Sequence, residues 1–539
     1  MLFLLFALWF SPSHLAAAWA QPTSVRVSLG WDGWIRFGTW NPVTVDVQVD
    51  RPVRGWLVVE VPQEFGTQRV RLRHRVDLPP AGGARWHLAV MLSDARRPVR
   101  ASVVLEEGSP VASAEVAPQP ERAAASVVAY LGADPPTPPQ EVSSGGRRAV
   151  VRLTEELLPD RAAAYASLDL LVVGELDERR LSEAQRRALQ TWVLHGGRVV
   201  VAGWLLPTAP LSGWLSVAQE VGAAGEAAGL RSVTDGPLRL LHPLPGSQLV
   251  VERSRTVAVW ASRGLGRVYA WAVGAARVPP DSPLWYLALP APLPHEGPPE
   301  VESRPRVPLA PAAAGLGLYV ALWLVAVWLA GRSGLGWLAA GLVLAASAAG
   351  MPVLADRVRQ SSAVLEAVWV EVAVEGTRRT YGWGRTQAPY RGSHTYTLPS
   401  VEAVAVSGGF TEVEVAWLAD RVLVRADQAA GERLRLRWEA LADVPAPQAE
   451  ARNGAVVVQG AGGAEGLAFW GSRQAPLERS GASDQWVASR WQPVEPHHPA
   501  LEAFRWAQPG AATIVEDRPV VAFPPGEGRQ GWLVVVGSR

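Results

Sequence analysis

The first part of the chain alternates apolar and polar residues in short runs that glycine and proline separate. Such runs fill residues 21–121 at the spacing of a β-sandwich, and no helical period of useful length interrupts them. Residues 356–539 return to the same alternation. The pattern predicts an N-terminal β-sandwich domain at 21–121 and a β-rich C-terminal domain at 356–539.

Residues 122–290 have a different pattern. The run LDLLVVG at 168–174 is apolar without alternation, which is typical of a strand buried on both faces of a parallel sheet. A helix should follow, since Ser182 and Gln185 have capping-box spacing and Gly196-Gly197 can end the helix in a left-handed conformation. Strand, helix and strand in this order predict a parallel sheet with right-handed crossovers. The segment 255–274 predicts a hairpin at the sheet edge.

Two long uncharged runs follow a Pro-rich linker at 291–307. Residues 308–331 and 334–355 are each long enough for a membrane-spanning helix, and the short turn Gly331-Arg332-Ser333 joins them. Glycine, alanine and serine in the second run would let the two helices approach closely. The pattern predicts a two-helix transmembrane hairpin at 308–355, with both flanking regions on the same side of the membrane.

An export signal is predicted at residues 1–20, where a short apolar run ends in Ala-Trp-Ala. No basic residue precedes the apolar run, so an uncleaved anchor or a misassigned start remains the alternative. The signal places the large domains outside the cytoplasm. Charge favours the opposite orientation, with four arginines beside the hairpin on the domain side against one in its turn: Arg304, Arg306, Arg357, Arg359 and Arg332. Because long domains translocate largely regardless of flanking charge, we expect the cell membrane with extracytoplasmic domains.

Composition narrows the function classes. The 539 residues carry a net charge of +1, which argues against nucleic-acid binding through bulk charge. The chain has no cysteine, so disulfides, thiolate metal sites and cysteine nucleophiles are excluded. Every basic residue other than histidine is arginine, which we interpret as a composition bias of the genome and not as a recognition signal.

The order of these segments resembles a family of bacterial envelope membrane proteins that carry a class I glutamine-amidotransferase-like domain between β-sandwich domains. The resemblance is carried by GWDGWIRFGTWNPVTV near the start, by LDLLVVGELDERRLSEAQRRALQTWVLHGGRVVVAG in the middle, and by SRGLGRVYAW after it. It implies a flavodoxin-like α/β fold for 122–290. Members with amidotransferase activity place a cysteine in the turn after the strand that corresponds to 198–202. This chain has Ala202, Gly203 and Trp204 in that turn, so the resemblance implies a degenerate domain.

Other residues could supply chemistry, but each has a simpler structural interpretation. Glu175 and Asp177 follow a buried strand and could form a hydrolase site, or they could be loop and helix-terminal charges. His195 falls at a helix end, where a cation is favourable. His497 and His498 stand beside Glu495 between prolines, a weak signal for metal binding. We therefore predict no catalytic, cofactor-binding or metal-binding residues, and no cofactor.

Tryptophan offers the last clue. Trp31, Trp34 and Trp40 could stack on sugar rings, or they could fill sandwich cores. Trp323, Trp328 and Trp337 are expected at the membrane interface. The sequence favours a non-catalytic, membrane-anchored envelope protein that acts as an interaction, scaffolding or ligand-sensing module with a protein partner. A cell-wall glycan-binding protein and an unorthodox hydrolase using Glu175 and Asp177 are the alternatives.

Overall fold

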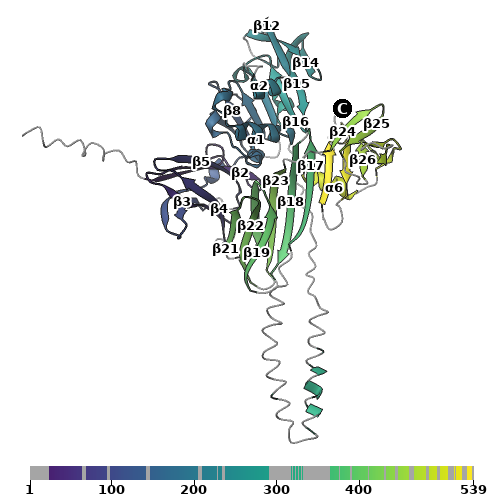
Figure 1. Ribbon diagram of the computed structural model, residues 1–539. Coiled ribbons are helices and arrows are strands. Elements are labelled where there is room, and N and C mark those ends of the chain that lie inside the picture. Colours follow the sequence, from purple (N-terminus) through teal and green to yellow (C-terminus); the bar gives the residue numbers. More distant parts are fainter. Residues whose placement is uncertain are drawn as a thin grey trace, which may run out of the picture.

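The structure, a computed structural model, is dominated by β-strands. It describes residues 23–63, 68–93, 97–140, 142, 146–203, 209–227, 229–233, 237–290, 317, 320–321, 323–325, 327–328, 331, 341, 365–375, 377–388, 391–410, 412–429, 432–442, 447–460, 466–480, 485–494, 498–507, 515, 518–524 and 531–536. Of these residues, 54% lie in strands and 15% in helices. Figure 1 shows two β-sandwiches side by side with a central domain above them.

The first sandwich is built from strands in the N-terminal region. One sheet has the order β1-β2-β5, and the facing strands run in the order β4-β3-β6-β7. Their bounds are Ser24–Leu29 for β1, Trp40–Gln48 for β2, Val53–Pro62 for β3, Arg69–Leu78 for β4, Gly83–Met91 for β5, Val99–Leu105 for β6 and Pro110–Val116 for β7. Alternating burial along β3 and β4 places valine and leucine inward and arginine and glutamate outward, as the sequence pattern predicts.

A second sandwich from the C-terminal region continues the first one. Its strands are β17 (Glu366–Val374), β18 (Thr377–Gln387), β19 (Gly392–Pro399), β20 (Ala403–Gly408), β21 (Glu412–Trp417), β22 (Arg421–Gln428) and β23 (Arg433–Ala442). Strand β21 pairs in parallel with β4, which gives one seven-stranded sheet in the order β19-β22-β21-β4-β3-β6-β7. Buried residues of both sandwiches form a single apolar cluster. The two sandwiches therefore share one core, although the central domain separates them in sequence.

Alternating charge follows the strand pair that joins the sandwiches. The Nη1 of Arg73 lies 2.9 Å from a carboxylate oxygen of Glu414, and Arg71 pairs with both Glu412 and Glu60. On the inner face Val70 lies opposite Val413. A shift of one residue would turn the valines outward and separate the charges, so the two patterns together select this register.

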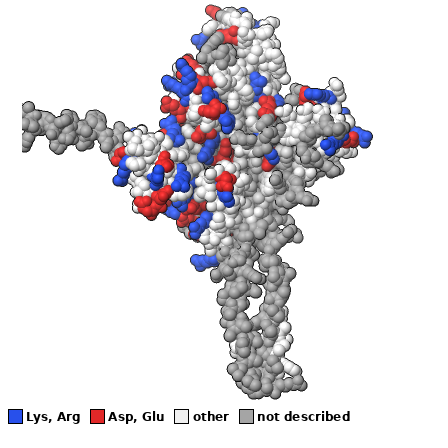
Figure 2. All heavy atoms as spheres, in the orientation of Figure 1, with Lys and Arg blue, Asp and Glu red and all other residues white. Residues whose placement is uncertain are grey.

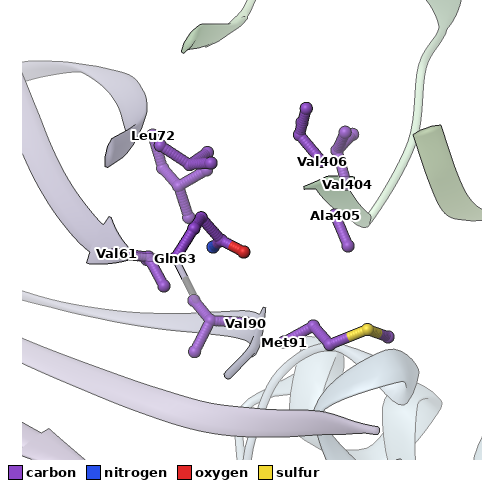
Figure 3. Close-up of a pocket in the computed structure, with 9 residues that line it drawn as sticks. Val61, Gln63, Leu72, Val90, Met91, Val404, Ala405 and Val406 are labelled. Atoms are coloured by element: carbon purple, nitrogen blue, oxygen red, sulfur yellow. The ribbon is translucent and has the colours of Figure 1, made fainter. Parts of the chain in front are cut away.

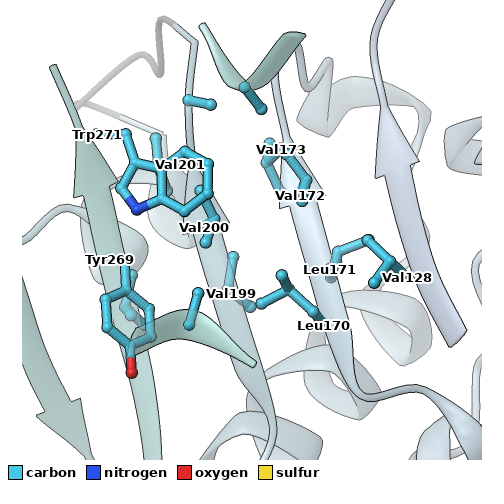
Figure 4. Packing of buried hydrophobic residues seen from close by; sticks show 14 of the residues in the cluster. Val128, Leu170, Leu171, Val172, Val173, Val199, Val200, Val201, Tyr269 and Trp271 are labelled. Atoms are coloured by element: carbon cyan, nitrogen blue, oxygen red, sulfur yellow. The ribbon is translucent and has the colours of Figure 1, made fainter. Parts of the chain in front are cut away.

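The central domain contains a seven-stranded mixed sheet in the order β14-β15-β16-β11-β10-β8-β9. Its strands are β8 (Ser126–Leu131), β9 (Arg148–Leu153), β10 (Leu170–Val173), β11 (Arg198–Val201), β14 (Gln248–Glu252), β15 (Arg255–Arg263) and β16 (Gly266–Trp271). The five strands from β16 to β9 are parallel. Figure 4 shows how the apolar side chains of these neighbouring strands pack together.

Helix α1 (Glu183–Leu194) packs against the strand β16. The predicted capping box is confirmed, because Ser182 accepts a hydrogen bond from the Gln185 amide and Gln185 bonds back to the Ser182 amide. Gly196 has a φ of 115°, as predicted for the residue that ends this helix. The predicted hairpin is formed by β15 and β16, although β14 lies outside it and makes the sheet edge.

The remaining C-terminal residues extend the second sandwich. Strands β32 (Gly531–Val536), β31 (Val520–Phe523), β26 (Leu467–Trp470), β27 (Arg473–Pro476) and β30 (Gln492–Pro493) continue the sheet that begins β20-β23-β18-β17. A four-stranded sheet joins β24 (Gln448–Arg452), β25 (Ala455–Gln459), β29 (Gln485–Ala488) and β28 (Glu478–Arg479). Helix α6 (Pro499–Ala507) packs against β17 and β32.

The predicted flavodoxin-like, amidotransferase-like α/β domain is wrong. That fold alternates strands with full helices, whereas α1 is the only helix longer than two turns among the described residues of 122–290. Two 3₁₀ helices, η3 (Glu155–Leu157) and η4 (Ala162–Ser167), connect β9 to β10, and the proline-rich segment 135–139 precedes β9. Proline has no amide to donate and cannot continue a helix, which explains why the proline-bearing segment between β8 and β9 forms no helix among its described residues.

The predicted transmembrane hairpin is also not supported. No helix of the described residues is long and apolar enough to cross a membrane. Most of 308–355 lies outside the described residues, as do the predicted signal at 1–20 and Trp337. The long uncharged runs were the whole basis of this prediction, and apolar length in a sequence does not by itself establish a continuous helix.

Candidate functional site

We call the backbone that follows β8, β10, β11 and β16 the carboxyl edge of the central sheet. The sequence places the candidate catalytic residues at this edge. Gly174 follows β10 and Gly203 follows β11 at this edge. A Cβ atom added to Gly203 would lie 1.4 Å from the carbonyl oxygen of Gly174. No side chain fits in that space, so a nucleophile could not replace Gly203 without moving the backbone. Trp204 lies outside the described residues.

An arginine from a neighbouring hairpin closes the same edge. The hairpin consists of β12 (Ala218–Glu226) and β13 (Pro237–Pro243). From β13, the Nη1 of Arg239 donates to the Gly203 carbonyl oxygen at 2.8 Å, and its Nη2 donates to the Trp271 carbonyl oxygen. Glu220 of β12 lies 3.6 Å from this guanidinium. Burial lowers the pKa of the Arg239 guanidinium. The carbonyl groups at the ends of β11 and β16 are thus occupied by the chain itself.

The two candidate carboxylates do not form a paired acid–base site. Glu175 is exposed, while Asp177 accepts hydrogen bonds from the Arg179 amide at 3.2 Å and the Arg179 Nε at 2.9 Å. These bonds lower the pKa of the Asp177 carboxyl, and they make Asp177 the N-cap of the 3₁₀ helix η5 (Glu178–Arg180). Asp177 therefore has a structural role, and it carries no raised pKa of the kind a general acid needs.

The neighbouring Glu178 is the buried carboxylate of this loop, and sequence reasoning missed it. Its oxygens accept hydrogen bonds from the amides of Leu211, at 3.0 Å, and Ser212. These amides begin the short helix α2 (Pro210–Leu215). Glu178 caps that helix, which accounts for its burial without a role in chemistry.

His195 is buried and neutral, which corrects the interpretation of it as a helix-terminal cation. Burial, with a smaller effect of Arg379, lowers the pKa of its imidazole well below the usual value. Its Nε2 lies 3.3 Å from the hydroxyl oxygen of Thr377, whose own proton goes to the Val374 carbonyl at 2.8 Å. His195 Nε2 must therefore be the donor, and the imidazole joins α1 to the β17–β18 turn of the second sandwich.

Of the histidine pair near the C-terminus and its neighbour Glu495, the structure describes only His498. His498 packs its ring against Phe469 and Trp532, at centroid distances of 5.0 and 5.9 Å, and Glu495 and His497 lie outside the described residues. Nowhere in the described part of the chain do three or more histidine, aspartate or glutamate side chains gather closely enough to hold a metal ion.

The early tryptophans face the interior. Trp31 is 2% exposed and donates its indole N–H to the Ser167 hydroxyl at 2.9 Å, and its ring packs against Tyr165 of the central domain. Trp34 is partly buried under Arg147. Trp40 is fully buried. The motif GWDGWIRFGTW thus joins the first sandwich to the central domain, and the buried rings of Trp31 and Trp40 are closed to sugar rings, although Phe37 is 42% exposed.

Trp40 enters a buried charged cluster where the three domains meet. We call Trp40, Arg379, Glu402 and Glu439 the junction cluster. Glu439 accepts the indole N–H of Trp40 at 2.6 Å and pairs with Arg379, and all three of these side chains are at most 5% exposed. From η4 of the central domain, the Ala163 amide donates to the carboxylate of Glu402 at 3.2 Å.

The charged side chains of the junction cluster all belong to the second sandwich, and neutral N–H groups of the other two domains donate to its carboxylates. Burial raises the pKa of the Glu402 carboxyl, and Arg379 opposes this shift. Burial would lower the pKa of Arg379, but Tyr381 and the carboxylates of Glu439 and Glu402 raise it overall. A buried ion pair that loses one partner is strongly destabilising. The hydrogen bonds from the Trp40 indole and the Ala163 amide link this buried charge to the other two domains. No local motif signals the junction cluster, because its members are far apart in sequence.

The seam between the two sandwiches leaves little empty space. Figure 3 shows a cavity between β3, β4 and β5 on one side and β20 on the other. Its volume is about 10 Å³, enough for about one water molecule, and Gln63 supplies the polar side chain in its lining. This cavity is too small for an organic ligand, and its position shows close packing of the joined core.

Comparison with known proteins reaches only the first sandwich. Residues 22–119 match a family model described as a domain of unknown function (DUF8726). No curated protein is significantly similar to the chain. The matched segment contains β1 to β7 and the motif GWDGWIRFGTW, so it includes the side chains that contact the central domain.

Proposed function

We propose that this chain is a non-catalytic interaction or scaffolding protein of the cell envelope that presents its surfaces to a protein partner. The observation that carries the proposal is the closed carboxyl edge, where Gly203 lies against the Gly174 carbonyl and Arg239 holds the carbonyls of Gly203 and Trp271. A site that the backbone itself fills leaves no room for a nucleophile and substrate together.

The junction cluster supports the scaffolding part of the proposal. Arg379 and Glu439 of the second sandwich meet Trp40 of the first, and Glu402 meets η4 of the central domain. Bodies fixed in this way keep their surfaces in a constant relation, which a protein needs if it holds a partner in a defined geometry. Placement outside the cytoplasm depends on the export signal expected at residues 1–20.

The two alternative functions have less support. A glycan-binding surface built on the early tryptophans would need exposed rings, and Trp31 and Trp40 are buried. A hydrolase using Glu175 and Asp177 would need two carboxylates with contrasting pKa values in one site, and Asp177 instead caps η5.

A pair of experiments on the full-length chain tests the proposal. We expect no covalent adduct with acyl-type active-site probes and no turnover of ester, amide or glycoside substrates, with Glu175→Ala and Asp177→Ala unchanged. A stable adduct, or steady product release that either variant abolishes, would overturn the non-catalytic assignment.

The scaffolding role is tested by in-cell crosslinking. Glu439→Gln weakens the junction cluster and should reduce the yield of the partner crosslink several-fold. Arg54→Gln, which alters an exposed ion pair on the first sandwich, is the matched control and should leave the yield unchanged. Equal yields for both variants would contradict a role for the fixed domain arrangement.

A further inference from the structure

Strand β14 forms an unprotected outer edge of the central sheet. It pairs with β15 on one side, and no strand of the described residues pairs with its other side. Its Leu249 and Val251 are 49% and 56% exposed, while Val250 between them packs against the core of the domain. Figure 1 shows β14 at the outside of the central domain, beyond β15. Backbone groups and apolar side chains are thus both available along this edge.

Strand β14 is short, with five residues, and its register against β15 shifts between Val250 and Val251, but it lacks the proline and basic residues that protect many edge strands. Its sequence QLVVE contains no proline and no basic residue, and Glu252 at its end accepts hydrogen bonds from the amides of Arg231 and Ser232. The opposite edge strand, β9, carries Arg148 and Arg152. Charge on an edge strand discourages pairing with another chain, so one edge of this sheet is guarded and the other is open.

We propose that β14 pairs antiparallel with β14 of a second copy of this chain. Centred on Val250, this pairing places Leu249 opposite Val251 of the partner and Gln248 opposite Glu252 of the partner. Each exposed apolar side chain then meets an apolar side chain, and the single acidic residue meets an amide. The strand is its own complement, as the isologous interface of a two-fold dimer requires.

Charge excludes the competing arrangements of two copies. A parallel, in-register pair would set Glu252 beside Glu252 of the second copy. An antiparallel pair centred on Glu252 would do the same and would leave Leu249 without a partner. Like charges directly opposite each other are destabilising, so only the pairing centred on Val250 matches all five residues of the strand.

The β12–β13 hairpin of the central domain also exposes apolar side chains. Val221 of β12 and Leu240 of β13 are 53% and 46% exposed, and the β13 strand packs against β15. In Figure 2 charged side chains gather over the first sandwich and the adjoining part of the central domain, and the side that carries β14 and β15 is mostly uncharged. A second copy would therefore extend the sheet on its mostly uncharged side. This inference does not depend on whether the chain has an enzymatic activity.

The mass of the purified full-length chain tests the dimer. Light scattering in a mild detergent, which suppresses association through other apolar surfaces, should give twice the 57.7 kDa chain mass at micromolar concentration. The double variant Leu249→Lys/Val251→Lys should stay monomeric to at least tenfold higher concentration. Leu418→Lys, at a site 42% exposed on the second sandwich, should behave like the wild type. Unchanged thermal unfolding of the double variant shows that it folds.

A disulfide provides the second measurement, because the chain has no cysteine of its own. Val250→Cys places two thiols across the two-fold axis, where Cα atoms of opposed antiparallel residues lie about 4.5–5.5 Å apart, within the range of a disulfide. Mild oxidation should link most of the chains, whereas Leu418→Cys should link few. A monomeric wild type, a dimer that survives the lysine pair, or equal crosslinking of both variants would overturn the proposal. A monomeric wild type would overturn it even if β14 pairs with a different protein.

Discussion

The carboxyl edge of the central sheet and the junction cluster differ in what occupies them. At the carboxyl edge, backbone meets backbone, with Gly203 against Gly174 and an arginine of a nearby hairpin bonded to the remaining carbonyls. At the junction cluster, Arg379 and Glu439 meet Trp40 in a water-excluded space between domains. The carboxyl edge lies where a reactive site is often found, but it lacks the side chains that a reactive site needs. The junction cluster has charged side chains, and its carboxylates accept hydrogen bonds from neighbouring domains. Position within a fold is therefore a poor guide to function unless the occupying atoms are known.

Filling the carboxyl edge should have the largest effect. Gly203→Cys would place a thiol at this edge, but its Cβ would lie 1.4 Å from the Gly174 carbonyl oxygen. We expect a loss of more than about 5 kcal/mol in the free energy of unfolding, or failure to fold. Gly274→Ala is the control, because a Cβ there meets nothing within 4 Å and φ is −63°. A stable Gly203→Cys protein with thiol-dependent glutamine hydrolysis would show that the edge can open.

Breaking the junction cluster should have the next largest effect. Arg379→Met leaves the buried carboxylate of Glu439 with only the more distant and more exposed Arg437, 3.8 Å away, which should cost on the order of 4 kcal/mol in urea unfolding. The double variant Arg379→Met/Glu439→Gln should recover part of the loss, because the amide is neutral and can still accept the Trp40 indole N–H. Arg421→Met, on an exposed arginine of β22, is the control. Equal losses for the single and double variants would contradict a buried charge imbalance as the cause.

Local structure could be predicted from the sequence where a short motif determines it. The capping box of Ser182 and Gln185 and the helix end at Gly196 follow from side-chain hydrogen bonds and backbone freedom within a few residues. The flavodoxin-like fold could not be obtained in this way. The family resemblance implied it, and only one strand–helix–strand unit supported it. The segment after β8 carries prolines at 135–139, and the β9–β10 connection contains the 3₁₀ helices η3 and η4 in place of an amphipathic helix.

Long-range pairing was beyond the sequence. Arginines alternate along β4 and glutamates along β21, and each pattern alone predicts a half-exposed strand. That these two strands are neighbours depends on the joint packing of two sandwiches that the central domain separates. The same holds for the candidate site. The sequence shows that Gly203 has no nucleophilic side chain, but it does not show that Arg239 bonds to the carbonyls at this edge.

Acid should weaken the seam between the sandwiches. His74 of β4 stacks on Trp417 of β21, with ring centroids 4.4 Å apart, and burial lowers the pKa of its imidazole from 6.5 to about 3. The folded state thus binds fewer protons than the unfolded state, so stability is complete above pH 6.5 and falls as the pH drops toward 3. Between pH 6.5 and pH 4 this amounts to about 3 kcal/mol.

Urea unfolding across this pH range checks the prediction. His74→Phe keeps an aromatic ring against Trp417 and cannot be protonated, so it should flatten the pH dependence by about 3 kcal/mol between pH 6.5 and pH 4. Replacement of the exposed His242 by phenylalanine should leave the slope unchanged. Part of the slope should remain in His74→Phe, because burial also lowers the pKa values of His87 and His195. A slope identical to that of the wild type would show that His74 is protonated in the folded protein.

The alternating arginine and glutamate pairs between β4 and β21, which we call the charge ladder, should have the smallest effect on the free energy of unfolding. Arg73 and Glu414 are 2.9 Å apart, with side chains 29% and 33% exposed, so a double-mutant cycle with Arg73→Gln and Glu414→Gln should give a coupling of about 0.5 kcal/mol that salt weakens. The exposed pair Arg54 and Asp77 should give no measurable coupling. Since the apolar core shared by the sandwiches already opposes separation, the ladder selects the register of β4 against β21 and adds little to its stability. A coupling that exceeds the loss in Arg379→Met would reverse this ranking and would make surface charge, not the junction cluster, the main link between the sandwiches.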